Sequence, residues 1–243
     1  IDGGRVVARW RKRLLPNYDV FDEARYFEPA GPQPVVAFRG RRLGVSICED
    51  LLAQSLLGKP LYQCDPVAEL AAAGADLLVN ISASPFVLGK TEWRRRVIAD
   101  AARRTGCPLV YVNQIGGNDH LLFDGASGAV SAAGVPLAQA RSFAEDVLIV
   151  DEADATPGRC EPVAAGVASL HDALVMGLRD YVRKCGFAEV VIGLSGGIDS
   201  AVVAALAAAA LGPRAVHGVA MPSRFSSDHS VADARELAAN LGM

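Results

Sequence analysis

A run of serine and glycine residues in the C-terminal part of the sequence has the composition of a phosphate-binding loop. The run is Ser195-Gly196-Gly197-Ile198-Asp199-Ser200, directly after the apolar residues 190–194. Adjacent glycines let the backbone approach phosphate oxygens, and a following helix offers free N–H groups to an anion. Serine hydroxyls can donate to phosphate, and an aspartate can hold Mg²⁺. The alternative is an ordinary capped glycine turn, and the absence of Gly-Lys-Ser/Thr disfavours transfer of a γ-phosphate.

One of the five cysteines, Cys48, ends a second apolar run and is followed by Glu49 and Asp50. A thiol at the end of a strand is placed like the nucleophile of a sharp elbow, with the next backbone N–H facing the same substrate. A cysteine after apolar residues is more often part of a core. The two acidic residues argue against deep burial of this cysteine.

Apolar runs bounded by glycine, proline and asparagine predict the strands that must position these residues. In the first segment we expect strands buried on both faces at residues 6–10, 35–38, 43–47, 77–81, 109–113, 129–131 and 147–150. Helices are expected at residues 66–73 and 92–105. The arginines of the second of these helices are expected on its solvent side: Arg94, Arg95, Arg96, Arg103 and Arg104.

The second segment alternates more regularly between helical and strand patterns. We expect helices at residues 167–185, 200–211 and 230–241, and strands at 190–194 and 215–220. This βαβα order predicts a parallel sheet with crossover helices. An acidic stretch with two prolines separates the segments. The expected organisation is therefore α/β, with domains at residues 1–150 and 166–243 and a linker at 151–165.

The loop at Ser195 to Ser200 resembles that of the N-type ATP pyrophosphatases, which adenylate a carbonyl oxygen before an amine attacks it. Downstream, Met221-Pro222-Ser223-Arg224 and the serines after it resemble the NAD synthetases. This resemblance implies deamido-NAD as the substrate, ATP and Mg²⁺ as cofactors, and Asp199 as the metal ligand. The residues implied to bind ATP are Ser195, Gly196, Gly197, Asp199, Ser200 and Arg224. Taken alone, Arg224 is explained equally well as a solvated loop arginine.

A second set of motifs lies in the first segment. The sequence from Lys12 to Glu23, with its Leu-Pro-Asn-Tyr, resembles the glutaminase domains of glutamine-dependent NAD synthetases. These domains belong to the carbon–nitrogen hydrolase (nitrilase) superfamily, which implies an αββα sandwich and a Glu-Lys-Cys triad. By this resemblance Cys48 is the nucleophile, Lys12 and the Glu49 amide stabilise the oxyanion, and Glu23 orients the lysine. Without this resemblance, Lys12 would be interpreted as part of a solvated run of charges, Arg11-Lys12-Arg13.

The same resemblance implies a glutamine-binding set: Tyr18, Glu49, Ser84 and Lys90. Glu49 would meet the α-amino group of glutamine. The triad's general-base glutamate should precede Lys12, but no glutamate does so. We therefore expect that residues are missing upstream, or that this polypeptide is catalytically incomplete. The resemblance runs along the whole sequence, as the later part of a glutaminase domain followed by the start of a synthetase domain.

The expected activity is hydrolysis of glutamine and use of its ammonia to amidate ATP-activated deamido-NAD, giving NAD, AMP, pyrophosphate and glutamate. Two alternatives remain open. One is another glutamine amidotransferase with the same adenylation loop, such as a GMP or asparagine synthetase. The other is a non-catalytic binding or assembly fragment. The family resemblance also implies a homo-oligomer.

Composition narrows the range of partners and surroundings. The net charge is −3, so no broad attraction to nucleic acid or anionic membranes is expected. No apolar run reaches the roughly 18 residues of a membrane span. The cysteines are odd in number and form no Cys-x-x-Cys, which indicates neither a disulfide framework nor a zinc site. We expect a reducing, cytoplasmic setting.

Overall fold

The structure is a computed structural model that describes residues 1–52, 62–151, 157–224 and 228–243. These residues form two compact units. Unit 1 contains Ile1–Ile115 and Phe123–Ala164, and unit 2 contains Gly116–Leu122 and Ala165–Met243. Both units combine helices with strands, which confirms the predicted α/β class. Residues 152–156 of the expected linker lie outside the described residues.

Unit 1 is built on a six-stranded sheet with the order β1-β2-β3-β4-β7-β8. The strands are β1 (Val35–Phe38), β2 (Arg41–Ile47), β3 (Leu77–Ser82), β4 (Leu109–Asn113), β7 (Gly128–Val130) and β8 (Pro136–Gln139). The central strands β2, β3 and β4 are parallel, while β1, β7 and β8 join by antiparallel pairing. Parallel strands end at the same edge, so the residues that follow β2, β3 and β4 are brought together there.

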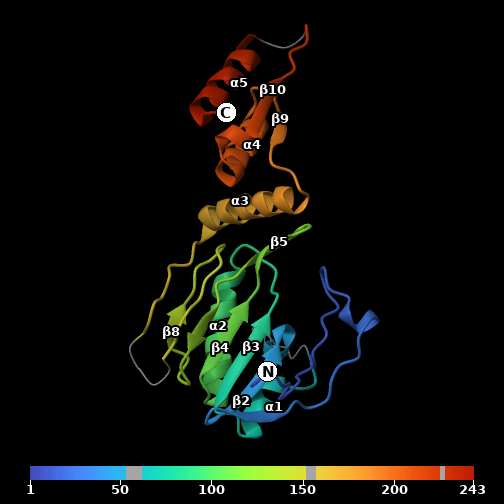
Figure 1. Ribbon diagram of the computed structural model, residues 1–243, viewed down its shortest axis with the longest axis vertical. Coiled ribbons are helices and arrows are strands. Elements are labelled where there is room, and N and C mark those ends of the chain that lie inside the picture. Colours follow the sequence, from blue (N-terminus) through green and yellow to red (C-terminus); the bar gives the residue numbers. More distant parts are fainter. Residues whose placement is uncertain (53–61, 152–156, 225–227) are drawn as a thin grey trace. The chain divides into compact units, whose positions relative to one another are not determined.

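Two helices cover one face of this sheet (Figure 1). Helix α1 (Pro66–Ala72) begins with proline, and its N-cap Asp65 accepts a hydrogen bond from the N–H of Ala68. Helix α2 (Lys90–Thr105) is flanked by Gly89 and Gly106, both with positive φ.

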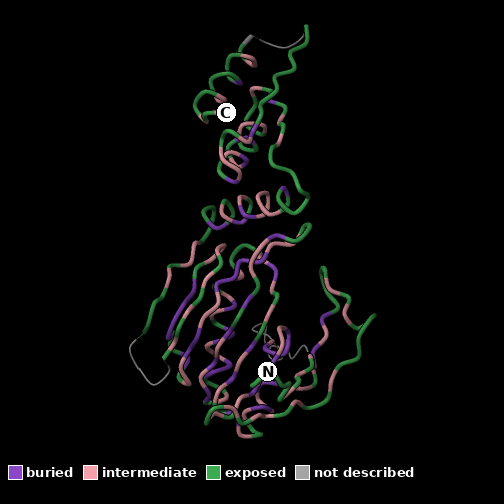
Figure 2. Tube along the Cα trace, in the orientation of Figure 1, coloured by how far each residue is buried: buried purple, intermediate pink, exposed green. Residues whose placement is uncertain are grey.

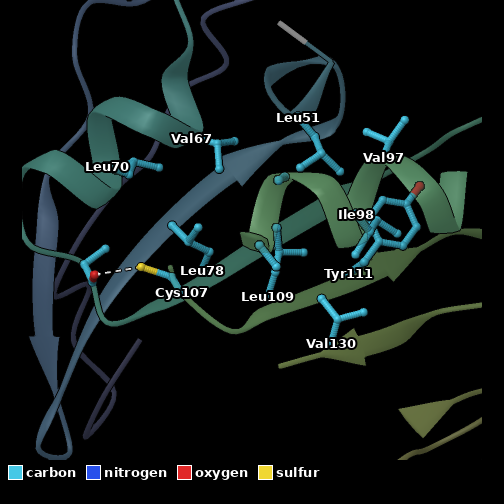
Figure 3. Close-up of a cluster of buried hydrophobic side chains, with 13 residues drawn as sticks. Leu51, Val67, Leu70, Leu78, Val97, Ile98, Cys107, Leu109, Tyr111 and Val130 are labelled. Atoms are coloured by element: carbon cyan, nitrogen blue, oxygen red, sulfur yellow. Dashed lines mark hydrogen bonds between the residues drawn. The ribbon is translucent and has the colours of Figure 1, made fainter. Parts of the chain in front are cut away.

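The core lies between these helices and the sheet (Figure 3). Helix α1 contributes Val67 and α2 contributes Ile98, and they pack with Leu78 of β3 and Leu109 of β4. Cys107 belongs to this core, where its Sγ donates to the carbonyl oxygen of Ala75 at 3.2 Å. Burial of the apolar side chains fixes the positions of β2, β3 and β4, and hence of the residues at their ends.

Unit 2 contains α3 (Gly166–Lys184), β9 (Val190–Leu194), α4 (Ile198–Leu211), η3 (Pro213–Ala215), β10 (Val216–Ala220) and α5 (Asp228–Leu241). Strands β9 and β10 are parallel, which confirms the predicted βαβα order. Buried Leu194, Ala204 and Ala234 join β9, α4 and α5 in a small core. Unit 2 also holds the tip of a hairpin formed by β5 (Ile115–Asn118) and β6 (Leu121–Asp124). The N–H of Gly117 in this tip donates to Asp180 of α3 at 2.9 Å.

Two predicted strands are wrong, because residues 6–10 and 147–150 have no strand structure. The N-terminal segment is exposed almost throughout (Figure 2), and its backbone pairing is an isolated bridge between Asp2 and Arg5. Residues 147–150 likewise have no ladder partner within the described chain. Apolar composition alone cannot form a strand without a neighbouring strand to accept its hydrogen bonds. Three short strands, β5, β6 and β8, were not predicted; β5 is glycine-rich and β8 begins with proline.

The prediction that the central strands are buried on both faces is also wrong. Along β3 and β4 burial alternates, and Ile81 and Val112 are 45% and 46% exposed. The helices cover one side chain in two along each strand, since successive side chains point to opposite faces. In the described part of the chain, no helix combines the length and apolar character needed to cross a membrane.

Candidate active site

The thiol of Cys48 lies at the carboxyl end of β2, where the chain turns sharply into the short helix η2 (Cys48–Leu51). The residue has a φ of +49°. This left-handed conformation costs a non-glycine residue about 1–3 kcal/mol and persists only where its surroundings enforce it. Asp50 provides part of that enforcement, since its Oδ2 accepts from the N–H of Ile47 at 3.0 Å. The structure thus has the sharp elbow expected from the sequence.

Lys12 and Glu23 form a close ion pair. The Nζ of Lys12 donates to the two carboxylate oxygens of Glu23 at 2.6 and 2.7 Å. Lys12 is half-buried, so the charged run Arg11-Lys12-Arg13 is not simply a solvated face. Glu23 belongs to the short helix η1 (Glu23–Arg25), whose first N–H donates to the carbonyl of Pro16. The pair holds the lysine ammonium in one orientation.

Asp50 connects this lysine segment to the cysteine elbow. Its Oδ1 accepts from the N–H groups of Arg13 and Leu14 at 2.9 and 2.8 Å, while Oδ2 holds Ile47. Burial raises the pKa of Asp50, and these backbone hydrogen bonds oppose that shift. Sequence reasoning missed this residue as part of the site. Its position two residues after Cys48 was visible, but its partners 36 and 37 residues away were not.

Glu49 is a buried carboxylate held by two phenols. Its side chain accepts from the hydroxyl of Tyr18 at 2.9 and 3.0 Å and from that of Tyr62 at 2.9 Å. Burial and then the charge of Glu49 raise the pKa of both tyrosines. Glu49 and Asp50 are themselves buried, at 2% and 1% exposed. Cys48 itself is only half-buried, which confirms the expectation that this cysteine is not deeply buried.

The loop after β3 is anchored to the end of the neighbouring strand β4. The N–H of Ser84 donates to Oδ1 of Asn113, at the end of β4, at 2.9 Å. Asn80 donates to Oγ of Ser46 at 2.9 Å and to the carbonyl of Cys48 at 3.4 Å. The elbow and the Ser84 loop are therefore tied to adjacent parallel strands.

Lys90 begins α2 immediately after the Ser84 loop. Burial lowers the pKa of Lys90, and the charge of Arg94 lowers it further, while Cys48 and Glu49 act in the opposite direction. A cation at this point of the site can bind an anionic substrate group.

The prediction that Arg94 lies on the solvent side of its helix is wrong. Its side chain is 4% exposed and lies 2.6 Å from Asp124, which is 1% exposed. Its guanidinium also lies over the ring of Tyr111, 5.7 Å from the centroid, and burial raises the pKa of that phenol to about 12. Arg94 occupies the face of α2 that packs on the sheet, where a charge is tolerated because a carboxylate meets it.

The second candidate site, in unit 2, is the loop between β9 and α4. Gly196 has a φ of +78°, and a Cβ at this position would lie 2.5 Å from the carbonyl oxygen of Ser230 in α5. The hydroxyls of Ser195 and Ser200 lie 3.1 Å apart, and Ser195 Oγ accepts from the N–H of Gly197 at 3.2 Å. The loop is thus shaped by its own short-range hydrogen bonds and by close packing against α5.

The acidic and basic residues expected in the second site are both exposed. Asp199 lies in the first turn of α4, and Arg224 follows β10. Residues 225–227, which include two serines of the predicted motif, lie outside the described residues. Among the residues that are described, no group of three or more His, Cys, Asp or Glu side chains can hold a metal. A single carboxylate fits Mg²⁺ that arrives with nucleotide phosphates, because Mg²⁺ is commonly held by one or two carboxylates plus phosphate oxygens.

Comparisons with known proteins match a family to each of the two parts of the chain. Residues 1–156 match the carbon–nitrogen hydrolase family, and residues 170–243 match the NAD synthase family. The chain is 44% identical over 252 residues to the glutamine-dependent NAD(+) synthetase of Synechocystis, with 100% of this chain and 45% of the relative covered. It is 42% identical to that of Rhodobacter capsulatus, covering 98% of this chain and 43% of the relative.

A solved structure shows the same similarity in three dimensions. The glutamine-dependent NAD+ synthetase of Acinetobacter baumannii, in complex with ADP, superposes with a TM-score of 0.89 at 37% identity. The match covers 99% of this chain and 44% of the other. The chain therefore spans less than half the length of the relatives that it resembles.

Proposed function

The chain belongs to the carbon–nitrogen hydrolase family, and from this membership we propose that it carries the glutaminase site and the adenylation loop of a glutamine-dependent NAD synthetase. The observation that carries the proposal is the strained Cys48 elbow, tied through Asp50 to the segment that holds Lys12 against Glu23. A nucleophile, a fixed cation and a backbone N–H after the nucleophile supply two parts of acyl transfer, which are attack on the carbonyl carbon and stabilisation of the oxyanion. The proposed glutaminase domain is residues 1–150, and the proposed synthetase domain is residues 166–243.

The proposed first reaction is hydrolysis of glutamine. The Cys48 thiolate attacks the carboxamide carbon and a C–S bond forms; the C–N bond then breaks, and the departing nitrogen takes up the proton removed from the thiol and leaves as ammonia. Lys12 and the N–H of Glu49 receive the oxyanion of the tetrahedral intermediate, and Glu23 keeps the lysine in place. Water then cleaves the thioester to give glutamate. Removal of the thiol proton is assigned in the family to a further glutamate, and none precedes Lys12 in this sequence.

Four residues are proposed to recognise glutamine: Tyr18, Glu49, Ser84 and Lys90. The buried carboxylate of Glu49 suits the α-amino group, because an ammonium would compensate its charge. The ammonium of Lys90 suits the α-carboxylate. Glu49 lies in η2 and Lys90 begins α2, and the two groups that they would bind are both attached to the α-carbon of glutamine.

The proposed second reaction takes place at the loop of unit 2. Ser195, Gly196, Gly197 and Ser200 bind the phosphates of ATP, with Arg224 on the nucleotide side. Mg²⁺, held by Asp199 and phosphate oxygens, would neutralise charge on the departing pyrophosphate. Adenylation of the nicotinate carboxylate of deamido-NAD releases pyrophosphate, and attack by ammonia then gives NAD and releases AMP. We place this chemistry in the cytoplasm and in a homo-oligomer, as the family resemblance implies.

The test compares two ammonia sources in the full natural polypeptide that contains this chain. Cys48→Ala should abolish NAD formation from glutamine while leaving NAD formation from added ammonium salt at the wild-type rate. Cys160→Ala, which changes an exposed thiol in the same unit, is the matched control and should behave as wild type with both donors. Glutamine hydrolysis by Cys48→Ala at the wild-type rate would refute the nucleophile assignment.

The product separates this proposal from its alternatives. Formation of GMP or asparagine without NAD would assign the adenylation loop to another amidotransferase. Binding of glutamine and ATP with no turnover of either would favour a non-catalytic fragment.

A further inference from the structure

A buried polar network lies behind the proposed glutamine-binding residues. At its centre is Asp124, the last residue of β6. Its Oδ2 accepts from Oγ1 of Thr91 at 2.7 Å and from Arg94 at 2.6 Å. Its Oδ1 accepts from Nδ2 of Asn113 at 3.3 Å. All four residues are buried, so these hydrogen bonds are shielded from competition by water.

The chemistry of its neighbours fixes the orientation of the Asn113 amide. Its NH₂ group faces two acceptors, the carboxylate of Asp124 and the carbonyl of Gly125 at 3.1 Å. Its oxygen is therefore directed to the remaining neighbour, the N–H of Ser84, at 2.9 Å. Reversing the amide would place donor against donor at Ser84 and acceptor against acceptor at Asp124 and Gly125. Asp124 thus determines which atom of Asn113 meets the Ser84 loop.

The other oxygen of Asp124 acts on the beginning of α2. Thr91 is the second residue of this helix, and Lys90 is the first. The bond from Thr91 to Asp124 holds the first turn of α2 against the sheet, and Arg94, one turn along, makes a second attachment to the same oxygen. A single carboxylate therefore positions both Ser84, through Asn113, and Lys90, through the first turn of α2.

We propose that Asp124 is a positioning residue for glutamine binding, which sets the Ser84 loop with one oxygen and the Lys90 turn with the other, with Arg94 as its fixed counterion. This inference rests on the glutaminase function proposed above. Asp124 has no role in the chemical step at Cys48. Its loss should therefore weaken binding of glutamine more than it slows turnover.

Asp124→Asn is the sharpest test, because the amide has the shape of the carboxylate but only one acceptor oxygen. In one orientation its NH₂ faces the donor groups of Arg94, and in the other it faces the NH₂ of Asn113 and favours reversal of that amide. We expect the KM for glutamine to rise about tenfold or more, as for loss of a hydrogen bond to a charged group, with kcat within about threefold of wild type. NAD formation from ammonium salt should not change.

A matched control is Asp100→Asn, which makes the same substitution on the exposed face of α2, where Asp100 pairs with Arg104. It should leave both kinetic constants for glutamine unchanged. A double-mutant cycle then tests the route of the effect. Asn113→Ala removes the acceptor for Ser84, so adding Asp124→Asn to it should raise KM by less than Asp124→Asn does alone. Fully additive effects would contradict positioning of Ser84 through Asn113.

The outcomes separate this inference from the proposed function. An unchanged KM for glutamine in Asp124→Asn, beside a Cys48→Ala variant that cannot use glutamine, would overturn the positioning role alone. If Cys48→Ala still used glutamine, the proposed function would fail first.

If Asp124→Asn does not fold, the milder Thr91→Val decides, since it removes one donor to Oδ2 and keeps the side-chain shape. It should raise KM about threefold without changing the rate with ammonium salt, and an equal loss with both donors would assign the network to stability.

Discussion

The two candidate sites both follow parallel strands, but they are constructed differently. At Cys48 the charged groups are buried or half-buried and are already paired: Lys12 with Glu23, and Glu49 with two phenols. At the loop of Ser195 to Ser200 the polar groups are mostly exposed, and their hydrogen bonds join residues within the loop. The first site depends on residues distant in sequence, whereas the second is largely shaped within six consecutive residues.

The difference follows from the chemistry proposed for each site. A nucleophile and an oxyanion-stabilising cation must be held at fixed positions, because their contribution depends on their placement before the reaction. Phosphate binding uses backbone N–H groups and hydroxyls that a glycine turn and a helix N-terminus supply together. Substitutions at the first site should therefore act through remote partners, and those at the second through backbone conformation.

The largest expected effect is at the paired cation of the first site. Lys12→Met keeps the length of the side chain but removes the charge that would stabilise the oxyanion. Glutamine hydrolysis should fall by about 10²–10³-fold in kcat, as for removal of an oxyanion donor. NAD formation from ammonium salt, measured in the same preparation of the full polypeptide, should be unaffected.

Arg11→Met is the control for this substitution, since Arg11 is exposed and its side chain lies outside the Lys12–Glu23 pair. It should hydrolyse glutamine at the wild-type rate. A Lys12→Met variant that retains more than a tenth of the wild-type kcat would show that the lysine is only structural. In that case the contrast between a preorganised and a locally shaped site would lose its main support.

The next effect is at the backbone of the second site. Gly196→Ala introduces a Cβ where φ is +78° and where the carbonyl oxygen of Ser230 would lie 2.5 Å away. The loop or α5 must shift, which should destabilise unit 2 by about 1–3 kcal/mol. Because the backbone and hydroxyl groups proposed to bind phosphate would move with the loop, ATP-dependent adenylation, measured by pyrophosphate exchange, should fall at least about tenfold, which corresponds to a loss of about 1.4 kcal/mol in binding free energy.

Gly193→Ala is the matched control on β9. A Cβ at Gly193 meets only the flexible end of Met221, at 3.1 Å, and requires no positive φ. It should retain adenylation within about threefold of wild type. Glutamine hydrolysis should persist in both glycine variants, and its loss in Gly196→Ala alone would mean that the two sites are not built independently.

The sequence predicted best what depends on neighbouring residues. The loop between β9 and α4, the sharp turn at Cys48 and the central strands β2, β3 and β4 lie where composition and spacing indicated. The meeting of Lys12 with Glu23 was expected only through the family resemblance. Eleven residues separate these two, and no local pattern shows that they form a pair.

What the sequence could not predict depends on pairs that the fold creates. Arg94 was expected in solvent because it stands in a run of arginines, but its partner Asp124 lies 30 residues away on another element. Asp50 was an acidic residue of no assigned role until its backbone partners were known. The predicted strands at residues 6–10 and 147–150 are wrong because the described part of the fold places no strand beside them. Strand pairing needs such a neighbour, and apolar composition does not supply it.

A smaller effect should appear in the pH dependence of glutamine binding. The pKa of Lys90 is lowered by burial and by Arg94, and only the protonated form can bind the α-carboxylate. The KM for glutamine should therefore rise with pH at a lower pH than for an ordinary lysine. Lys90→Arg remains protonated, so its rise in KM should be smaller and should reflect only deprotonation of glutamine's own amino group.

The pH dependence of folding stability distinguishes this weaker binding of glutamine from unfolding of the protein. A lysine whose pKa is lowered in the folded state penalises folding when it is protonated, so its contribution to stability improves as pH rises through the lowered pKa and is lost as pH falls through it. Glutamine affinity and this contribution to stability should therefore move in opposite directions on the alkaline side. Identical KM profiles for wild type and Lys90→Arg would remove Lys90 from the glutamine site.

The smallest expected effect concerns the strain stored at the nucleophile. Cys48→Ala and Cys48→Gly both remove the thiol, but only glycine adopts a φ of +49° without steric cost. Relief of this strain should make Cys48→Gly more stable than Cys48→Ala by about 1 kcal/mol, the lower end of the cost of a left-handed residue. Urea unfolding of the two variants measures the difference directly.

At Cys107, an ordinary buried position without positive φ, alanine should instead be the more stable of the two. The same order of stability at both cysteines would mean that the elbow at Cys48 is unstrained, and that its geometry comes from local sequence as the Ser195 loop does.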